Sequence, residues 1–302
     1  MRPSRIFTQE KDALVAFNGG FIMKTRVITG LVALAVFIPF LIFSDTWVFG
    51  LAMAVCSVVS VFEALRCVKL HKCLAVSIPL LALGFALPMY VYFAGGTVSF
   101  LRVAVPCILL LVLWLLAIAV FASEKIHLPD LSMAAFLCFY VICAFCSILF
   151  LRYYDELGAY TYLLIFIGAW ITDSFAYFCG VLFGKHKLIP HISPKKTVEG
   201  SIGGILFCGL AFVLYGFLLR HWLSIATDFN YFLLFAYGVV VSVVSQIGDL
   251  AMSAVKRHYQ IKDFGKVLPG HGGALDRFDS ILAVATVLFV LNEISSVFVA
   301  IA

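Results

Sequence analysis

Residues 131–151, LSMAAFLCFYVICAFCSILFL, form an apolar run that contains no charged side chain. About 20 such residues in a helix cross the hydrocarbon core of a bilayer, because each residue adds about 1.5 Å along the helix axis. The same template fits eight further stretches, so the predicted spans are 27–43, 46–64, 74–94, 102–122, 131–151, 160–182, 201–221, 231–250 and 281–301. The sequence therefore predicts an all-α, polytopic integral membrane protein with nine transmembrane helices.

The composition of the whole chain agrees with this prediction. Of its 302 residues, 64% are hydrophobic and 12% are charged. Soluble domains average about 45 to 50% apolar and about 25% charged residues, so an ordinary soluble protein is excluded. The net charge of +5 arises mainly from loops between the predicted spans. We attribute this charge to membrane orientation and expect no nucleic-acid partner.

Basic residues are distributed unevenly between the two alternating sets of loops. One set, which includes the amino terminus, holds 18 of the 21 lysines and arginines. Because these residues stay preferentially on the cytoplasmic side, we expect a cytoplasmic amino terminus and an external carboxyl terminus in the cell (inner) membrane. We interpret residues 1–22, which precede a second methionine at Met23, as a non-essential extension. Residues 23–302 would form one transmembrane domain.

Two long polar stretches, residues 183–200 and 251–280, both belong to the basic, cytoplasmic set of loops. Carboxylates in or near a bilayer are costly and usually functional. Asp249 ends the eighth apolar run, and Asp276 and Asp279 precede the ninth, three residues apart. Within a helix this spacing places both carboxylates on one face, where they repel unless a cation lies between them. Such hard oxygen ligands suit Mg²⁺.

The segment between Asp249 and Asp276 adds groups that a phosphorylated substrate needs. Its polar residues include Ser253, Lys256, Arg257, Lys262 and Lys266, followed by a glycine-rich turn at 269–273. Glycines let the backbone approach a phosphate closely, and lysine and arginine offset the charge of a triphosphate. Carboxylates, cations and a glycine turn together predict a phosphoryl-transfer site. These residues alone leave open an alternative, in which Asp276 and Asp279 are interfacial charges paired with Arg277.

The run from Ser253 to Asp279, SAVKRHYQIKDFGKVLPGHGGALDRFD, closely resembles the signature of the phosphatidate cytidylyltransferase family. That signature contains S-x-x-K-R, K-D and H-G-G-x-x-D-R-x-D at this spacing, and Ala274 departs from it, where a larger aliphatic residue is common. A second block is similar in the same order and contains Asp173-Ser174, Ala176-Tyr177, Gly180, Gly184-Lys185, residues 193–197 (SPKKT) and Glu199-Gly200. The resemblance implies transfer of a cytidylyl group from CTP to phosphatidate, giving CDP-diacylglycerol and pyrophosphate. The two blocks cover about residues 170–280, so the resemblance implies that the catalytic region lies there, and it also suggests a homodimer.

The second block has a physical interpretation of its own. Ser193 and Pro194 predict a helix start, since serine caps the first amides and proline fits the first helical position. Lys195 and Lys196 would then lie beside a positive helix end that attracts anions. Alternatively, the block is a basic loop that serves only membrane topology. Asp173 lies inside the sixth apolar run, where it either belongs to the site or bonds a neighbouring helix.

The residues named so far have specific expected roles. Asp249, Asp276 and Asp279 would hold one Mg²⁺, with room for a second cation, and together with Lys256 they form the expected catalytic group. The expected substrate contacts are Asp173, Ser193, Lys195, Lys196, Thr197, Ser253, Arg257, Lys262, His271, Gly272, Gly273 and Arg277. A phosphate monoester, with a second pKa of about 6, is already largely a dianion at neutral pH and needs no base. We therefore interpret His271 as a phosphate contact or a loop-shaping residue.

Three other classes of function fit the sequence less well. A CDP-alcohol phosphatidyltransferase would carry D-x-x-D-G-x-x-A-R, whereas this chain contains no Asp-Gly dipeptide. Residues 180–186, GVLFGKH, lack both the spacing and the Ser or Thr of a nucleotide-binding P-loop. A transporter would concentrate its polar groups near the bilayer midplane, whereas most of them lie here in two loops on one face.

Overall fold

The computed structural model describes residues 38–39, 41–154, 157–222, 230–267 and 272–295. Its long helices are α2 (Trp47–Cys67), α3 (Leu74–Phe93), α4 (Thr97–Phe121), α5 (Leu128–Tyr153), α7 (Leu163–Phe183), α8 (Val198–Trp222), α9 (Tyr231–His258) and α10 (Leu275–Ile294). A single turn, α6 (Gly158–Thr161), precedes α7. Strands β1 (Lys187–Ile189) and β2 (Ser193–Thr197) pair antiparallel between α7 and α8.

Within the described residues, seven helices are long and apolar enough to cross a bilayer. They are α2, α3, α4, α5, α6 together with α7, α8 and α9. The polytopic, all-helical class is therefore confirmed. Most of the predicted span 27–43 lies outside the described residues, and so does the whole extension before Met23. The predicted span 281–301 corresponds to α10, which begins earlier and carries charged residues in its first two turns, so the total of nine spans stays a prediction.

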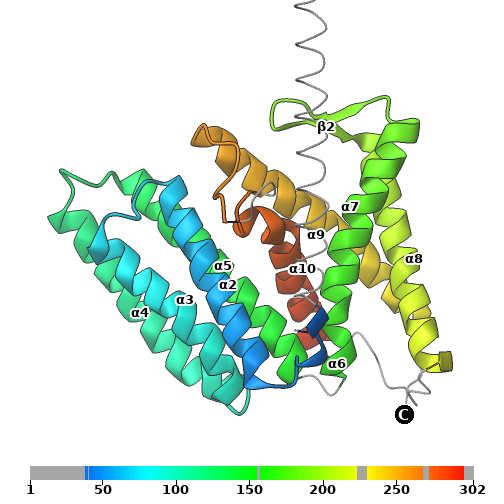
Figure 1. The fold of residues 1–302 in the computed structure, drawn as a ribbon, viewed down its shortest axis with the longest axis horizontal. Coiled ribbons are helices and arrows are strands. Elements are labelled where there is room, and N and C mark those ends of the chain that lie inside the picture. Colours follow the sequence, from blue (N-terminus) through cyan, green and yellow to red (C-terminus); the bar gives the residue numbers. More distant parts are fainter. Residues whose placement is uncertain (1–37, 40, 155–156, 223–229, 268–271, 296–302) are drawn as a thin grey trace, which may run out of the picture.

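Successive long helices run in alternate directions, so their connections gather at two ends of the bundle (Figure 1). One end carries the α2–α3 and α4–α5 connections, the β1–β2 ribbon and the connection from α9 to α10 (Figure 1). Both polar stretches of the sequence therefore lie at the same end, which we call the polar end. This alternation agrees with the predicted loop sets. Which side of the membrane the polar end faces stays a prediction.

Helix α10 lies between the two halves of the bundle (Figure 1). It packs against α9 and α7 on one side and against α5 and α2 on the other. Its inward residues include Leu282, Ala285 and Leu288, which are fully buried. The ring of Phe278 lies 5.3 Å from that of Phe145 in α5. The first turn of α10 is thus the point where the amino-terminal and carboxyl-terminal halves of the chain meet.

Small residues let α7 and α8 pack closely near the polar end. A methyl group at Gly203 of α8 would overlap Cys179 of α7, so a larger residue would force the helices apart. In a bilayer such small-residue contacts and interhelical hydrogen bonds hold helices together. Thr172 of α7 donates one of these bonds to the hydroxyl of Ser242 in α9, at 2.9 Å.

The predicted helix start at Ser193 and Pro194 is wrong. These residues open strand β2, and α8 begins only at Val198. Proline lacks an amide donor, but it is tolerated at the start of a strand on the edge of a short ribbon. The hydroxyl of Thr197 accepts a hydrogen bond from the amide of Gly200 at 3.2 Å, so threonine provides the side-chain cap of α8. The two lysines of this block therefore precede the helix, on a strand.

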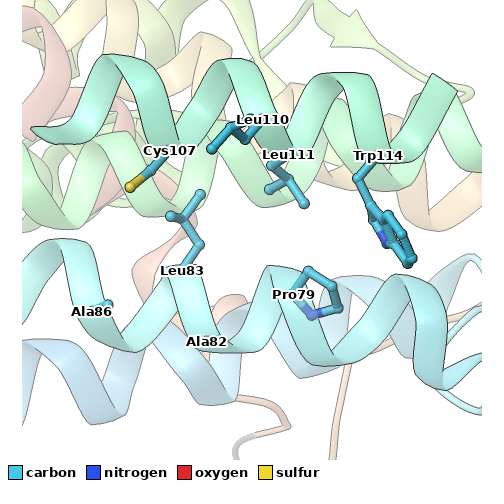
Figure 2. A pocket seen from close by; sticks show the side chains of 8 residues that line it. All are labelled: Pro79, Ala82, Leu83, Ala86, Cys107, Leu110, Leu111 and Trp114. Carbon is cyan, nitrogen blue, oxygen red and sulfur yellow. The ribbon is translucent and has the colours of Figure 1, made fainter. Parts of the chain in front are cut away.

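An apolar groove runs between α3 and α4 (Figure 2). Its lining consists of Pro79, Ala82, Leu83, Ala86, Cys107, Leu110, Leu111 and Trp114. The indole of Trp114 donates a hydrogen bond to the carbonyl of Ala75 at 2.8 Å, which uses the one indole N–H at this surface. A groove of this composition is compatible with lipid acyl chains and offers no charge to a nucleotide.

Candidate active site

Helices α9 and α10 touch where their acidic residues lie. A methyl group at Gly248 of α9 would overlap the Cβ atom of Ala283 and lie 3.2 Å from the backbone oxygen of Asp279. Only glycine allows this close approach of the two helices. Asp249 follows Gly248 directly, so the crossing brings its carboxylate into electrostatic contact with Asp279.

Three carboxylates from three helices form what we call the acidic cluster: Asp173 of α7, Asp249 of α9 and Asp279 of α10. Asp279 is only 9% exposed, and one of its oxygens accepts a hydrogen bond from the amide of Ser280 at 2.9 Å. The hydroxyl of Ser280 donates to Asp173 at 3.4 Å. Unfavourable charge interactions link Asp279 to both other carboxylates. Like charges this close need a cation or a proton to compensate them.

One compensating cation comes from the β1–β2 ribbon. The ammonium group of Lys196 forms an ion pair with Asp249, and their side chains are 26% and 28% exposed. The charge of Lys196 also acts favourably on Asp173. Lys195 is exposed, as expected for neighbours on a strand, whose side chains point to opposite faces. The ribbon therefore delivers one lysine to the acidic cluster and leaves the other at the surface.

The partners of Asp276 are different. One oxygen accepts a hydrogen bond from the ammonium group of Lys256 at 2.8 Å. The other oxygen accepts from the backbone amides of Phe264 and Gly273, at 2.8 and 3.0 Å. The side chains of this ion pair are nearly buried, at 11% exposed for Lys256 and 4% for Asp276. Asp276 thus joins α9, α10 and the connection between them.

Lys256 links this ion pair to the acidic cluster. Its charge acts favourably on Asp279, and its ammonium group lies 5.4 Å from the centroid of the Phe264 ring. Ser253 follows Asp249 by four residues and Lys256 follows Ser253 by three, which places all three on one face of α9. The predicted proximity of lysines and carboxylates is therefore present on both sides of the α9–α10 crossing.

The other predicted contacts surround this centre. Gly272 has a φ of +87°, which strongly favours glycine, and a methyl group there would lie 3.3 Å from Asp276. Ser193 and Ser253 are half-buried, Thr197 and Gly273 are buried, and Arg257, Lys262 and Arg277 are exposed. His271 lies outside the described residues. The three exposed cations belong to α9, α10 and the connection between them, at the polar end.

The donor set at the α9–α10 crossing fits Mg²⁺. Among the described residues, no three histidine, cysteine or acidic side chains are already grouped closely enough to hold a metal ion. Mg²⁺ usually takes only one or two carboxylates, however, and leaves its other positions to water and substrate phosphates. Asp249 and Asp279 offer hard oxygen ligands of this kind on adjoining helices. Asp276 is less available, because Lys256 and two amides already occupy both of its oxygens.

One carboxylate at the polar end was missed by the sequence interpretation. Glu63 of α2 is 1% exposed, and its two oxygens accept hydrogen bonds from the amides of Ala274 and Leu275, at 3.1 and 2.8 Å. A buried acid within the predicted span 46–64 meets the same criterion that selected Asp173. Its partners lie more than 200 residues away in the chain, so no local pattern indicates them.

Most of the chain is similar to one family of known proteins. Residues 24–295 match the cytidylyltransferase family. The chain is 36% identical over 280 residues to the phosphatidate cytidylyltransferase of Bacillus subtilis (strain 168), which covers 91% of this chain and 99% of that protein. The enzyme of the same name from Staphylococcus saprophyticus is 37% identical over 276 residues, with 89% and 98% covered. That of Staphylococcus aureus (strain COL) is 34% identical over 274 residues, with the same coverage.

Proposed function

Because the chain belongs to the cytidylyltransferase family, we propose that it transfers the cytidylyl group of CTP to phosphatidate at the α9–α10 crossing. The products are CDP-diacylglycerol and pyrophosphate. One observation carries this location: Asp249 and Asp279 converge from adjoining helices, with lysines beside them, at the end of the bundle that holds both polar stretches. A polytopic membrane enzyme with such a site can join a soluble nucleotide to a lipid phosphate.

The lysines around the acidic cluster are proposed to bind the anionic parts of the substrates. Lys196 and Lys256 are the inner pair, since each already contacts a carboxylate of the site. Lys195, Arg257 and Lys262 are exposed and form an outer group, which attracts the nucleotide and the lipid head group. Binding of the triphosphate gives Lys196 a second anionic partner beside Asp249. Lys196 then compensates negative charge of the triphosphate as well as that of Asp249.

The reaction is proposed to be an in-line displacement at the α phosphorus of CTP. An oxygen of the phosphatidate monoester forms a new bond to the α phosphorus. The bond from the α phosphorus to the oxygen that bridges to the β phosphate breaks, and pyrophosphate leaves with the bonding electron pair. The lipid phosphate is already a dianion, so no side chain needs to remove a proton. Positioning and electrostatic stabilisation then account for most of the rate.

Asp249 and Asp279 are the proposed ligands of Mg²⁺, and Asp276 supports them by holding Lys256. Asp276 can join the metal ligands only by giving up Lys256 or the loop amides. When bound, Mg²⁺ neutralises charge on the triphosphate during the transfer. A second cation could lie in the same cluster, beside Asp173. The protein's own side chains hold the phosphates of the two substrates in the orientation that in-line attack requires, and they disfavour other orientations.

The polar end is proposed to face the cytoplasm of the inner membrane. Its loops carry most of the described lysines and arginines, as the positive-inside rule requires, and CTP is supplied on that side. The assembly is proposed to be a homodimer, on the strength of the resemblance alone. No nucleic acid is proposed as a partner.

The experiment that tests this proposal uses purified protein in detergent with phosphatidate and each of the four nucleoside triphosphates. We expect pyrophosphate release and CDP-diacylglycerol formation with CTP, and Asp279→Asn should lower turnover at least about a hundredfold. Glu293→Gln is the matched control, because Glu293 is an exposed carboxylate at the opposite end of the same helix. Turnover of Asp279→Asn within a fewfold of wild type would refute the proposed site.

A further inference from the structure

Glu63 occupies the amino-terminal end of α10. The first amides of a helix have no partner within the helix, and together they form a positive end that favours an anion. In α10 the residue at the cap position is Ala274, whose side chain cannot accept a hydrogen bond. Glu63 of α2 replaces a local cap, because its carboxylate accepts the amides of Ala274 and Leu275. This contact joins the amino-terminal half of the bundle directly to the start of α10.

The connection between α9 and α10 closes around the same carboxylate. A methyl group at Gly265 would overlap Glu63, and the three nearest atoms it would meet all belong to that side chain. A methyl group at Gly273 would lie 2.5 Å from both carboxylate oxygens of Glu63. Asp276 accepts hydrogen bonds from the amide of Phe264, which directly precedes Gly265, and from the amide of Gly273 itself. The described parts of the connection are therefore fastened by α2 on one side and by α10 on the other.

We infer that Glu63 is a positioning residue of the active site, an inference that rests on the proposed function above. Its carboxylate fixes the first turn of α10, so that Asp276 meets Lys256 and Asp279 faces Asp249. It also fills the positive end of α10, so substrate phosphates do not bind there. The triphosphate is then directed to Lys256, which pairs with Asp276, and to Lys196, which pairs with Asp249. An acidic side chain in the amino-terminal half thus controls the geometry of a site built from the carboxyl-terminal half.

The first test compares Glu63→Gln with a matched control. Glutamine has nearly the same size but lacks the charge, and it turns an NH₂ group toward one of the two amides. We expect kcat per monodisperse protein to fall at least tenfold, the KM for phosphatidate to stay within twofold, and the amides of Ala274 and Leu275 to exchange faster. The control, Tyr154→Phe, removes a hydrogen bond of 2.7 Å to the Val91 carbonyl near the opposite end of the bundle. It should lower the melting temperature and leave kcat unchanged.

A double-mutant cycle tests the contact itself. Gly265→Ala alone should lower kcat at least tenfold, because the new methyl group displaces the Glu63 carboxylate. In a Glu63→Ala background the same change should cost less than twofold, since the space is then empty. If Glu63→Ala is not recovered as folded protein, Glu63→Ser serves as the background, because it removes the carboxylate, whose Oε1 and Cδ atoms lie nearest to the new methyl group. Additive losses in the cycle would overturn the inference.

Asp279→Asn, measured in parallel, separates the inference from the proposed function. Wild-type turnover of Asp279→Asn contradicts the proposed site. Loss of turnover in Asp279→Asn together with wild-type kcat in Glu63→Gln overturns only the positioning role. A fall in melting temperature without a fall in kcat would mean that Glu63 stabilises the fold and does nothing further for the site, which also overturns the inference.

Discussion

Gly248→Ala is the sharpest test of the close crossing between α9 and α10. The added methyl group would overlap the Cβ atom of Ala283 and lie 3.2 Å from the Asp279 carbonyl oxygen. Carbon atoms in contact prefer separations of about 3.5 to 4.0 Å, so the two helices must move apart by on the order of 1 Å. Asp249 directly follows Gly248, and the backbone oxygen of Asp279 is part of this contact, so we expect the separation of the two carboxylates to change as well.

A displacement of about 1 Å can cost about a hundredfold in rate when it misplaces reacting groups. Overpacking a tight contact also costs roughly 1–3 kcal/mol of stability. We therefore expect kcat of Gly248→Ala to fall between about tenfold and a hundredfold, with a lower melting temperature. Gly248→Ala combined with Ala283→Gly should recover most of the loss, because the second change removes the methyl group that is overlapped.

The assay is steady-state pyrophosphate release from CTP and phosphatidate in mixed micelles, normalised to monodisperse protein. Gly50→Ala provides the control, since a methyl group at that buried helical position would lie 3.6 Å from the nearest side-chain atom, which is ordinary contact. Gly→Ala changes without strain stabilise a protein by about 0.4–1 kcal/mol, so this control should keep full activity. Wild-type kcat in Gly248→Ala, or no recovery in the double variant, would refute the role given to the crossing.

Three further predictions concern the charges of the site. Asp276→Asn should lower kcat at least about a hundredfold, because the amide cannot satisfy both Lys256 and the two backbone amides, and wild-type kinetics would contradict this. Lys196→Met should raise the KM for CTP at least tenfold, whereas Lys195→Met should change it less than threefold. Equal effects would show that the strand does not place one lysine in the site and the other at the surface. Chelation with EDTA should abolish turnover and added Mg²⁺ should restore it, so full activity in EDTA would exclude the proposed metal.

The membrane helices could be predicted from the sequence because their length and composition are set by the bilayer. The run 131–151 lies within α5, whose ends extend it by only a few residues. The predicted apolar span 281–301 begins six residues after the start of α10, because Asp276 and Asp279 interrupt the apolar pattern there. Charged residues at the start of a helix that packs centrally do not resemble an apolar span, although the helix continues through them.

The candidate site was partly predictable for a related reason. Carboxylates and cations near the ends of apolar runs could be recognised one by one, and their proximity at one end of the bundle followed from the alternation of the helices. How they are paired could not be predicted, because Lys196 reaches Asp249 only through the pairing of β1 with β2. Such a ribbon is too short to show a strand periodicity. The role of Glu63 depends on a contact across most of the chain, which no local pattern contains.

The most direct test of the central claim follows the phosphorus atoms of CTP. Purified protein is incubated with phosphatidate and with CTP that is labelled at either the α or the γ phosphate. The account predicts that α label appears in a chloroform-soluble CDP-lipid, that γ label appears in pyrophosphate, and that Asp279→Asn gives neither product at a comparable rate. Label from the γ phosphate in the lipid, or α label that stays in water-soluble products, would contradict it.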